Sequence, residues 1–462
     1  MMTIEQAVDS LREEMIGSIQ RMVRIQSVKG EERPGMPFGE NVDRCYRAMM
    51  ALAASLGFTT RDFDGYAGHA EIGEGEETIG ILGHIDTVPL GEGWDLDPCS
   101  GALVDGKIYG RGVMDDKGPT IACLYAVKAL QLAGVPLRKK IRVIFGLDEE
   151  SDWKCMEHYL PLAGEPDCSF TPDGAFPVIY GEKGLSIFDL TGTFPGENSS
   201  GVSILEITGG NRANMVPDRC SARLRTGMEL ETALDEWNHA AGGTLTLRRE
   251  GEDYILEAEG LSAHGSTPEK GRNAVTLLLR FLHTLPLSQE LQGAVRCYLD
   301  HMVGHYGENL GCVMSDELSG PLTVNVGVIH YDGAQLRLTV NIRYPISRTV
   351  EEVYSGIRES LAGSGYALEP VSNKNPLYVD PKSPLVEKLM RAYQTVTGDM
   401  DHPPITISGG TYARAVKNAV AFGPVFPGHP EVGHQKNEWA AVEDLVLCAK
   451  AYAQGIAELL KD

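Results

Sequence analysis

Histidine and carboxylate side chains recur in this sequence where short apolar runs end. His84 and Asp86 close the run ETIGILGHIDTV, Glu149 and Glu150 follow KIRVIFGL, and Asp173 ends DCSFTPD. Apolar runs of this length are typical of buried strands. Because ligands bind beyond the carboxyl ends of the strands in an open α/β sheet, we expect these side chains to lie close together.

Two further residues of the same types occur in glycine-containing segments. Asp115 lies in GRGVMDDKG, before a predicted helix, and His434 lies in GHPEVGHQKNEW. Taken alone, each motif is more typical of ordinary structure, because a His-Asp pair often forms a surface hydrogen bond and acidic residues favour a helix N-terminus. Five such elements at predicted strand ends and adjoining loops together indicate a functional site.

The residue types indicate chemistry with divalent metal ions. Two imidazoles and several carboxylates, without a thiolate, suit zinc, manganese or cobalt. A carboxylate that bridges two ions about 3.5–4 Å apart gives the arrangement of aminopeptidases, in which a bridging water becomes a hydroxide nucleophile near neutral pH. A carboxylate that is not a ligand must take the proton of this water, and Glu149, beside Glu150, is the natural general base.

The segments around these residues predict an α/β fold. Apolar runs at 77–88, 140–147 and 167–173 read as strands, and 117–134 has helical periodicity. From about residue 183 the pattern changes to half-buried strands and amphipathic helices, and the α/β pattern returns from about residue 381. The elements expected there are a helix at 383–396, a strand at 403–407, a helix at 411–418 and a strand at 419–423. We therefore predict a discontinuous catalytic domain over 1–182 and 379–462, with a mixed sheet flanked by helices, interrupted by an α+β lid domain over 183–378.

Composition restricts the partners and the compartment. The net charge of -23 argues against binding to nucleic acid or to anionic membranes. Nine cysteines without a C-x-x-C pair fit a reducing compartment. The N-terminal segment reads as an amphipathic helix with Thr3 and Gln6 in capping-box spacing, not as a secretory signal, and no apolar run is long enough to span a bilayer. We expect a soluble cytoplasmic protein that acts on a small molecule.

Several motifs resemble the co-catalytic zinc metallopeptidase superfamily that includes acetylornithine deacetylase, succinyl-diaminopimelate desuccinylase and glutamate carboxypeptidase. They are GHIDTVP, GRGVMDDKGP, GLDEES, TPDGAFPVIYGEKG, GLSAHGSTPEKGRNAV, GGTYAR and the terminal GHQ. DDKGP, PDGAFPVIYGEKG and RANMVPD are similar to the dipeptidase V branch of bacterial Xaa-His or β-Ala dipeptidases. The resemblance runs from about residue 80 to about residue 435, which is most of the chain.

This resemblance implies roles for the clustered residues. One ion is held by His84, Asp115 and Asp173, and the other by Glu150, His434 and the bridging Asp115. Asp86 accepts a hydrogen bond from the His84 ring. Glu149 is the general base and then the acid that protonates the leaving amine. A cis peptide is expected between Asp115 and Asp116.

The resemblance also implies roles for the lid. His264 in SAHGSTP stabilises the oxyanion of the tetrahedral intermediate. Asn214 in RANMVP and Arg343 in NIRYP hold the C-terminal carboxylate of the substrate. Gly409 and Gly410 open the predicted TYAR helix, where backbone N–H groups could also meet a carboxylate. Thr411 and Tyr412 receive no role.

The function expected from these observations is hydrolysis of unblocked dipeptides at a centre of two divalent ions. Zinc is the expected metal, and manganese or cobalt is the alternative. The lid is about twice as long as the resemblance implies for dimeric members, in which the partner subunit supplies the oxyanion histidine, so we expect a monomer. An N-acyl amino acid deacylase or desuccinylase with the same mechanism is the alternative. A catalytically dead scaffold conflicts with the intact Glu149, and a serine hydrolase lacks the G-x-S-x-G motif.

Overall fold

The computed structural model describes residues 2–198, 201–241 and 245–461, and packing divides the chain into two compact units. The first contains the residues up to Gly181, Tyr378–Thr406 and those from Gly410 onward, and the second contains Glu182–Leu377 and Ile407–Gly409. The short segment Ile407–Gly409 lies within the range that we predicted for the catalytic domain. Two hydrogen bonds hold it in the second unit. The Lys183 N–H donates to the Ile407 carbonyl over 3.0 Å, and Arg343 Nη1 donates to the Ser408 carbonyl over 3.1 Å.

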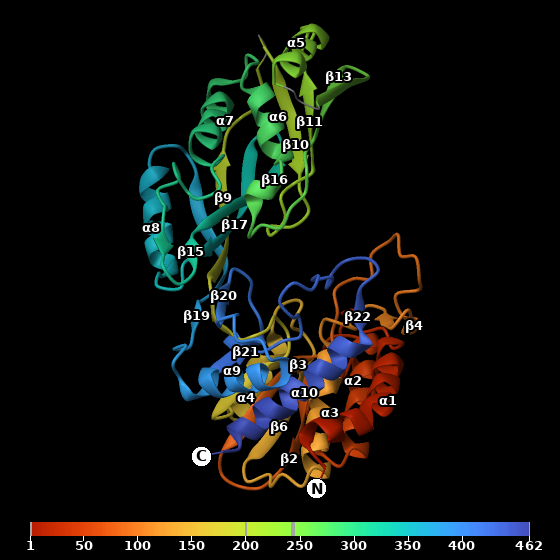
Figure 1. The fold of residues 1–462 in the computed structure, drawn as a ribbon. Helices are drawn as coiled ribbons and strands as arrows, with labels where there is room; N and C mark the ends of the chain where they lie inside the picture. Colours follow the sequence, from red (N-terminus) through yellow and green to blue (C-terminus); the bar gives the residue numbers. More distant parts are fainter. Residues whose placement is uncertain (1, 199–200, 242–244, 462) are drawn as a thin grey trace. The chain divides into compact units, whose positions relative to one another are not determined.

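The first unit is built on a sheet in the order β1-β2-β6-β3-β7-β21-β8-β19, with β20 paired to β8 (Figure 1). Strands β6, β3, β7 and β21 run parallel, whereas β1, β2 and β8 pair in antiparallel fashion, so the expected mixed sheet is confirmed. The strands are β1 Thr59–Phe63, β2 Ala67–Ile72, β3 Thr78–His84, β6 Lys140–Gly146, β7 Cys168–Thr171, β8 Ile179–Glu182, β19 Leu377–Tyr378, β20 Ile405–Ile407 and β21 Ala419–Ala421. A separate three-stranded sheet contains β4 Ala102–Val104, β5 Lys107–Tyr109 and β22 Trp439–Ala441.

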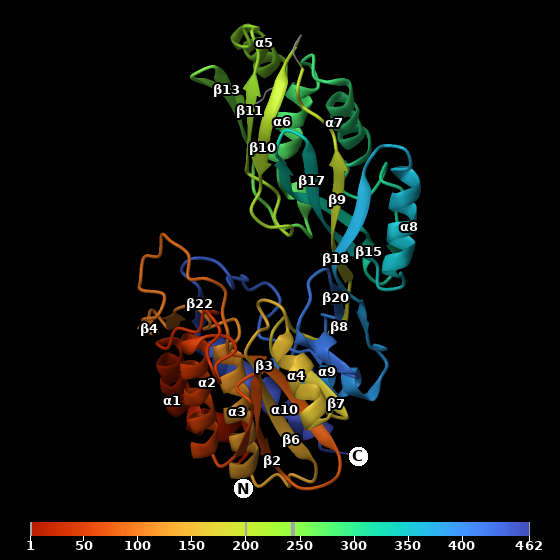
Figure 2. The same cartoon turned by 180° about the vertical axis from the view of Figure 1, so that it is seen from behind.

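Helices cover both faces of the main sheet. Helix α10 lies in front of it in Figure 1, and α4 lies in front of it in the opposite view of Figure 2. Helix α3 packs against α1, α10 and β3, and nearly all of its side chains are buried. The helices are α1 Ile4–Val23, α2 Glu40–Ser55, α3 Lys117–Leu132, α4 Lys154–Ala163, α9 Pro384–Thr397 and α10 Val442–Leu459.

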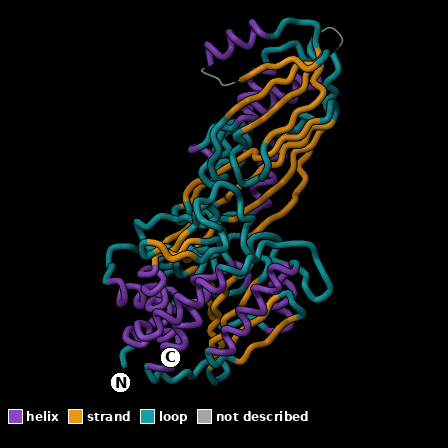
Figure 3. Tube along the Cα trace, turned by 90° about the vertical axis from the view of Figure 1, so that its right-hand side faces the viewer, coloured by secondary structure: helices purple, strands orange, loops and turns teal. Residues whose placement is uncertain are grey.

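The second unit is an antiparallel sheet in the order β12-β13-β11-β10-β16-β17-β9-β18 with helices packed on it (Figure 3). Leu278 and Leu282 of α6 belong to the same buried core as Val324 and Val340 of the sheet. The strands are β9 Gly184–Thr193, β10 Ser203–Gly209, β11 Arg219–Arg225, β12 Leu245–Glu250, β13 Asp253–Glu259, β16 Thr323–Tyr331, β17 Gln335–Tyr344 and β18 Ala367–Lys374, and a hairpin contains β14 Ser315–Asp316 and β15 Gly320–Pro321. The helices are α5 Glu231–Ala241, α6 Ala274–Leu282, α7 Gln289–His301, α8 Val350–Ser360 and the short η1 Pro268–Lys270.

Most of the local predictions are confirmed, and one is wrong. The capping box of Thr3 and Gln6 is present at the start of α1. The helix predicted at 411–418 is only the 3-10 turn η2 Tyr412–Ala415, since the backbone is extended again at Val416. Among the described residues, no helix combines the length and the low polarity that crossing a membrane requires.

Candidate metal centre

Asp115 lies between the two histidines that the sequence analysis selected. Its Oδ1 is 2.9 Å from Nε2 of His84, and its Oδ2 is 2.8 Å from Nε2 of His434. His84 is the last residue of β3, whereas His434 comes from the loop before β22. One carboxylate therefore contacts two imidazoles through opposite oxygen atoms, which would let Asp115 share one ion with each histidine.

The remaining carboxylates surround this pair. Glu150 Oε1 is 2.9 Å from His434 Nε2, and Asp173 Oδ2 is 3.8 Å from His84 Nε2. Two groups of potential ligand atoms are present, and the atoms within each group all lie within 4.8 Å of one another. One group contains His84, Asp115 and Glu150, and the other contains His84, Glu149 and Asp173. All five predicted ligands thus meet, and Glu149 reaches the same space.

The electrostatics of the cluster favour a bound cation. Burial, strengthened by the neighbouring Glu150, raises the pKa of Glu149 to about 8. Burial and the Asp115 charge raise the pKa of Asp173 well above its usual range. Burial works against ionisation of Asp115 too, but hydrogen bonds from His434 and His84 hold its pKa below the ordinary value. Crowded carboxylates with nitrogen and oxygen donors fit divalent ions such as zinc.

Asp86 contacts both the His84 ring and the loop after β6. The His84 ring nitrogen Nδ1 is 3.0 Å from the Asp86 backbone carbonyl and 3.5 Å from its Oδ1, so the predicted contact between ring and carboxylate is present beside a shorter one to the carbonyl. The Asp86 carboxylate also accepts the backbone N–H groups of Glu149 over 3.1 Å and Glu150 over 3.0 Å. Asp86 therefore links the His84 ring to the backbone of the two glutamates.

The peptide bond between Asp115 and Asp116 is cis, as the resemblance implied. The Asp116 side chain is buried and its Oδ2 accepts the backbone N–H of His84 over 3.2 Å and the hydroxyl of Thr120 over 2.8 Å. The two adjacent aspartates thus have different contacts. The Asp115 carboxylate contacts the two imidazoles, whereas the Asp116 carboxylate holds the backbone of the predicted ligand His84.

The loop after β6 is supported by residues that no sequence motif identified. The Trp153 indole donates to the Glu149 carbonyl over 2.7 Å and its ring packs edge-on against Tyr412. Tyr412, which had no assigned role, is fully buried, packs against the His84 ring and forms a 2.7 Å contact with Cys155 Sγ. It lies so close to β6 that a side chain at Gly146 would collide with its hydroxyl. The only sequence signal is a glycine at the end of a strand, which does not identify its partner.

The predicted lid residues lie mainly in the second unit. The backbone of Asn214 is adjacent to that of His264. The Gly265 N–H donates to the Asn214 carbonyl over 2.7 Å, and Met215 pairs with His264 in an isolated antiparallel β-bridge. His264 Nδ1 lies 2.6 Å from the Ser266 hydroxyl.

Arg343, on β17, is only 4% exposed, and its Nε donates to Asn341 Oδ1 over 3.3 Å. Gly409 belongs to the second unit and Gly410 to the first. These glycines precede Thr411, the N-cap of the short 3-10 helix η2, so no α-helix begins there.

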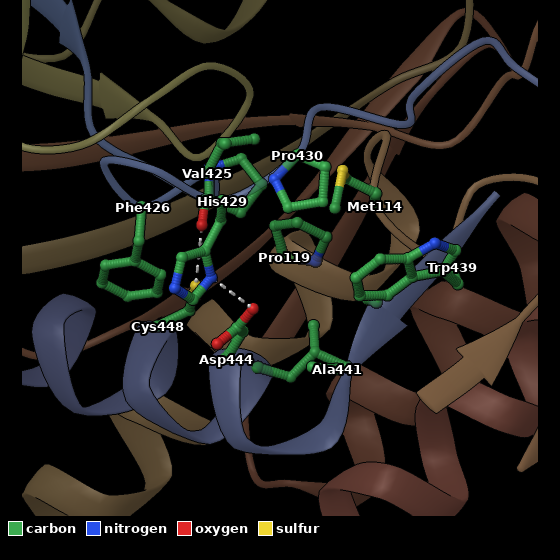
Figure 4. A pocket seen from close by; sticks show the side chains of 13 residues that line it. Met114, Pro119, Val425, Phe426, His429, Pro430, Trp439, Ala441, Asp444 and Cys448 are labelled. Atoms are coloured by element: carbon green, nitrogen blue, oxygen red, sulfur yellow. Dashed lines mark hydrogen bonds and ion pairs between the residues drawn. The ribbon is translucent and has the colours of Figure 1, made fainter. Parts of the chain in front are cut away.

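A small apolar pocket lies beside the predicted metal ligands in the first unit (Figure 4). Its wall includes Met114, which precedes Asp115, and Trp439, while an ion pair of 2.9 Å joins His429 to Asp444. None of the predicted ligands lines this pocket.

Comparison with known proteins matches residues 80–458 to the family described as "Peptidase family M20/M25/M40". A Bacillus subtilis (strain 168) protein named "Putative dipeptidase YtjP" is 38% identical over 464 residues, covering 97% of this chain and 98% of that protein. A Staphylococcus haemolyticus protein named "Putative dipeptidase SH1171" is 36% identical over 469 residues, covering 98% and 99%.

Solved structures share the fold at low sequence identity. Human carnosine dipeptidase 1 has a TM-score of 0.59 at 17% identity, with coverage of 99% of this chain and 98% of that chain. Aminoacylhistidine dipeptidase from Vibrio alginolyticus has a TM-score of 0.55 at 15% identity, with coverage of 96% and 95%. The expected family, fold and enzyme class are confirmed, and the chain belongs to peptidase family M20/M25/M40, a family of metal-dependent hydrolases.

Proposed function

We propose that the chain is a dipeptidase whose catalytic centre is formed by His84, Asp115, Glu150, Asp173 and His434. The observation that carries this proposal is the position of Asp115, whose two oxygens contact His84 and His434 at 2.9 and 2.8 Å. The relatives named as dipeptidases cover nearly the whole chain, which supports the substrate class.

Two divalent ions held by these residues would polarise the scissile carbonyl and lower the pKa of a water molecule. Glu149, whose backbone is fixed by Asp86, accepts the proton of the attacking water at its carboxylate and delivers it to the leaving amine. A carboxylate beside the predicted ligands that is not itself a ligand suits both steps, because it can take the proton and return it.

The second unit supplies the groups that recognise the substrate. His264 donates to the oxyanion that forms at the scissile carbonyl. Arg343 and Asn214 bind the C-terminal carboxylate, and burial of Arg343 favours this role because a poorly solvated guanidinium binds an anion strongly. The C-terminal carboxylate lies at the same distance from the last peptide bond in a peptide of any length, so its recognition selects that bond, and the preference for dipeptides rests on the relatives named as dipeptidases.

The proposal also covers the metal, the assembly and the compartment. Zinc suits the nitrogen and oxygen ligands. The eight-stranded sheet of the second unit, in which β10 pairs with β16, is formed within one chain and supports an active monomer. The nine cysteines, all within the described residues, are free thiols, which supports a cytoplasmic location.

A hydrolysis panel tests the function. The metal-stripped protein is supplied with Zn²⁺, Mn²⁺ or Co²⁺ and assayed on Ala-Ala, β-Ala-His, and N-acetyl and N-succinyl amino acids. We expect the unblocked dipeptides to be hydrolysed and the acylated amino acids to be poor substrates. Preferential hydrolysis of an N-acyl amino acid would show that the protein is a deacylase and not a dipeptidase.

A further inference from the structure

Glu438 is a buried carboxylate, four residues after His434, that the mechanism above does not use. It stands immediately before β22, where Trp439 pairs with Tyr109 of β5 and the Gly110 N–H donates to the Glu438 carbonyl over 2.9 Å. The Lys107 ammonium lies 3.6 Å from the centre of the Trp439 ring and stabilises the same pairing. This small sheet places the Glu438 side chain against the segment 110–115, which carries the bridging aspartate.

One oxygen of Glu438 orders that segment directly. Its Oε1 accepts the backbone N–H groups of Gly112 over 3.0 Å, Met114 over 3.0 Å and Asp115 over 3.4 Å. A single acceptor for these N–H groups fixes the path of the backbone up to the cis peptide. The pocket in Figure 4 lies beside this contact, since Met114 and Trp439 line it whereas Asp115 and Glu438 do not.

The other oxygen of Glu438 is joined to Arg111, which is 3% exposed. The ion pair from Arg111 Nη1 to Glu438 Oε2 measures 2.7 Å, and Nη2 of the same guanidinium lies 3.4 Å from the His434 carbonyl. His434 has a φ of 64°, a conformation that side chains other than glycine rarely adopt and that neighbouring contacts must hold. Arg111 and Glu438 therefore contact the two loops that carry Asp115 and His434.

We propose that Glu438, together with Arg111, is a positioning residue that sets the distance between Asp115 and His434 and so determines how tightly the centre binds its second ion. The inference rests on the proposed metal centre. A role in stability alone does not account for where the bonds lie, because removing one partner of a buried ion pair is destabilising wherever the pair is located. The backbone bonds of Glu438, in contrast, all converge on the segment of a predicted ligand.

Zinc binding by the full-length protein tests this proposal. Glu438→Gln keeps the volume of the side chain but sets an amide against the Arg111 guanidinium, so the pair is lost. We expect competition with a chromophoric chelator to show zinc affinity lowered about 10–100-fold, the range typical of residues that support metal ligands. Arg111→Lys, which retains the charge but not the forked guanidinium, should weaken zinc binding by a smaller factor.

Glu71→Gln is the matched control. Glu71 forms a 2.8 Å bond with Arg142, also in the first unit, and makes no contact with the predicted ligands. We expect its zinc affinity to stay within about twofold of wild type, and urea unfolding of all variants in EDTA measures their metal-free stability. If Glu438→Gln does not fold, Arg111→Lys alone decides the question.

The proposal is overturned if the folded Glu438→Gln variant binds zinc with wild-type affinity. If that variant does not fold, wild-type zinc affinity of Arg111→Lys overturns it. An equal loss in Glu71→Gln would show a general stability effect and would overturn it too. A wild-type protein that binds none of Zn²⁺, Mn²⁺ and Co²⁺ would instead refute the proposed function itself.

Discussion

Replacing Arg343 with alanine separates recognition of the substrate carboxylate from the chemical step. Arg343 is 4% exposed and is held by Asn341 and by the Ser408 carbonyl, so its guanidinium is oriented before substrate binds. We expect Arg343→Ala to lower kcat/KM for a dipeptide with a free C-terminal carboxylate. The C-terminal amide of the same dipeptide, which carries no charge for the guanidinium, should be affected much less.

The size of this effect follows from the type of bond that is lost. One hydrogen bond between charged partners contributes about 1.5–3 kcal/mol, and about 1.4 kcal/mol corresponds to a factor of ten. Loss of one such bond lowers kcat/KM about 10- to 150-fold, and loss of a forked pair lowers it further. Arg343→Lys keeps the charge without the fork and should give an intermediate value.

The assay compares Ala-Ala with its C-terminal amide for wild type, Arg343→Ala and His264→Ala. Wild type should prefer the free acid, Arg343→Ala should lose that preference, and His264→Ala should keep it while kcat falls about 10²–10³-fold. Equal hydrolysis of acid and amide by wild type would show that Arg343 does not bind the carboxylate, and the reasoning would fail.

Four further predictions follow from the same geometry. Glu149→Ala should lose about 10²–10⁴ in rate while both ions remain bound, whereas Glu150→Ala should lose one ion, and metal analysis that gives the opposite pattern would mean that the two roles are exchanged. In the metal-free protein, burial raises the pKa of Glu149 to about 8 from its ordinary 4.5, so its ionisation opposes folding increasingly as pH rises between these values. Urea unfolding in EDTA should therefore find Glu149→Gln more stable than wild type above pH 8, with no gain below pH 4.5, and a gain confined to low pH would contradict the stated cause. Asn325→Ala should lower kcat/KM about tenfold, because the Asn325 amide donates over 2.8 Å to both carbonyls that flank Asn214. Asn238→Ala, which breaks similar bonds to the backbone elsewhere in the second unit, should leave kcat/KM unchanged. Sedimentation of the active enzyme should show one chain per particle, and activity confined to a dimer would refute the monomer.

The sequence was sufficient to predict strands β3, β6, β7, β20 and β21 of the main sheet and the polar residues at the ends of β3, β6 and β7, but not β1, β2, β8 or β19. An apolar run followed by a polar side chain has one plausible location in an α/β fold, which is why His84 and Asp173 could be selected before the structure was known. Glu150 and His434 needed the combination of several motifs, since each is ordinary by itself. The structure brings all of these side chains to one place.

Other features depend on contacts that no local pattern records. The segment 411–418 has helix-forming residues, but Tyr412 is buried against β6 and the chain leaves the turn after Ala415. Arg343 alternates with apolar residues like a solvated strand residue, yet it is buried. Glu438 gives no signal because its partners are backbone N–H groups and an arginine far earlier in the chain. Asp86 was predicted to contact His84, but its spacing could not show that its carboxylate also accepts the backbone N–H groups of Glu149 and Glu150.

The central claim is that this chain hydrolyses dipeptides only when two divalent ions are bound among His84, Asp115, Glu150, Asp173 and His434. The most direct measurement is titration of the metal-stripped protein with Zn²⁺ while bound metal and Ala-Ala hydrolysis are followed in the same samples. The account predicts no hydrolysis without metal and a rate that reaches its maximum at two ions per chain, with Asp115→Ala inactive and deficient in metal. Full activity of the metal-free protein, or of Asp115→Ala, would contradict it.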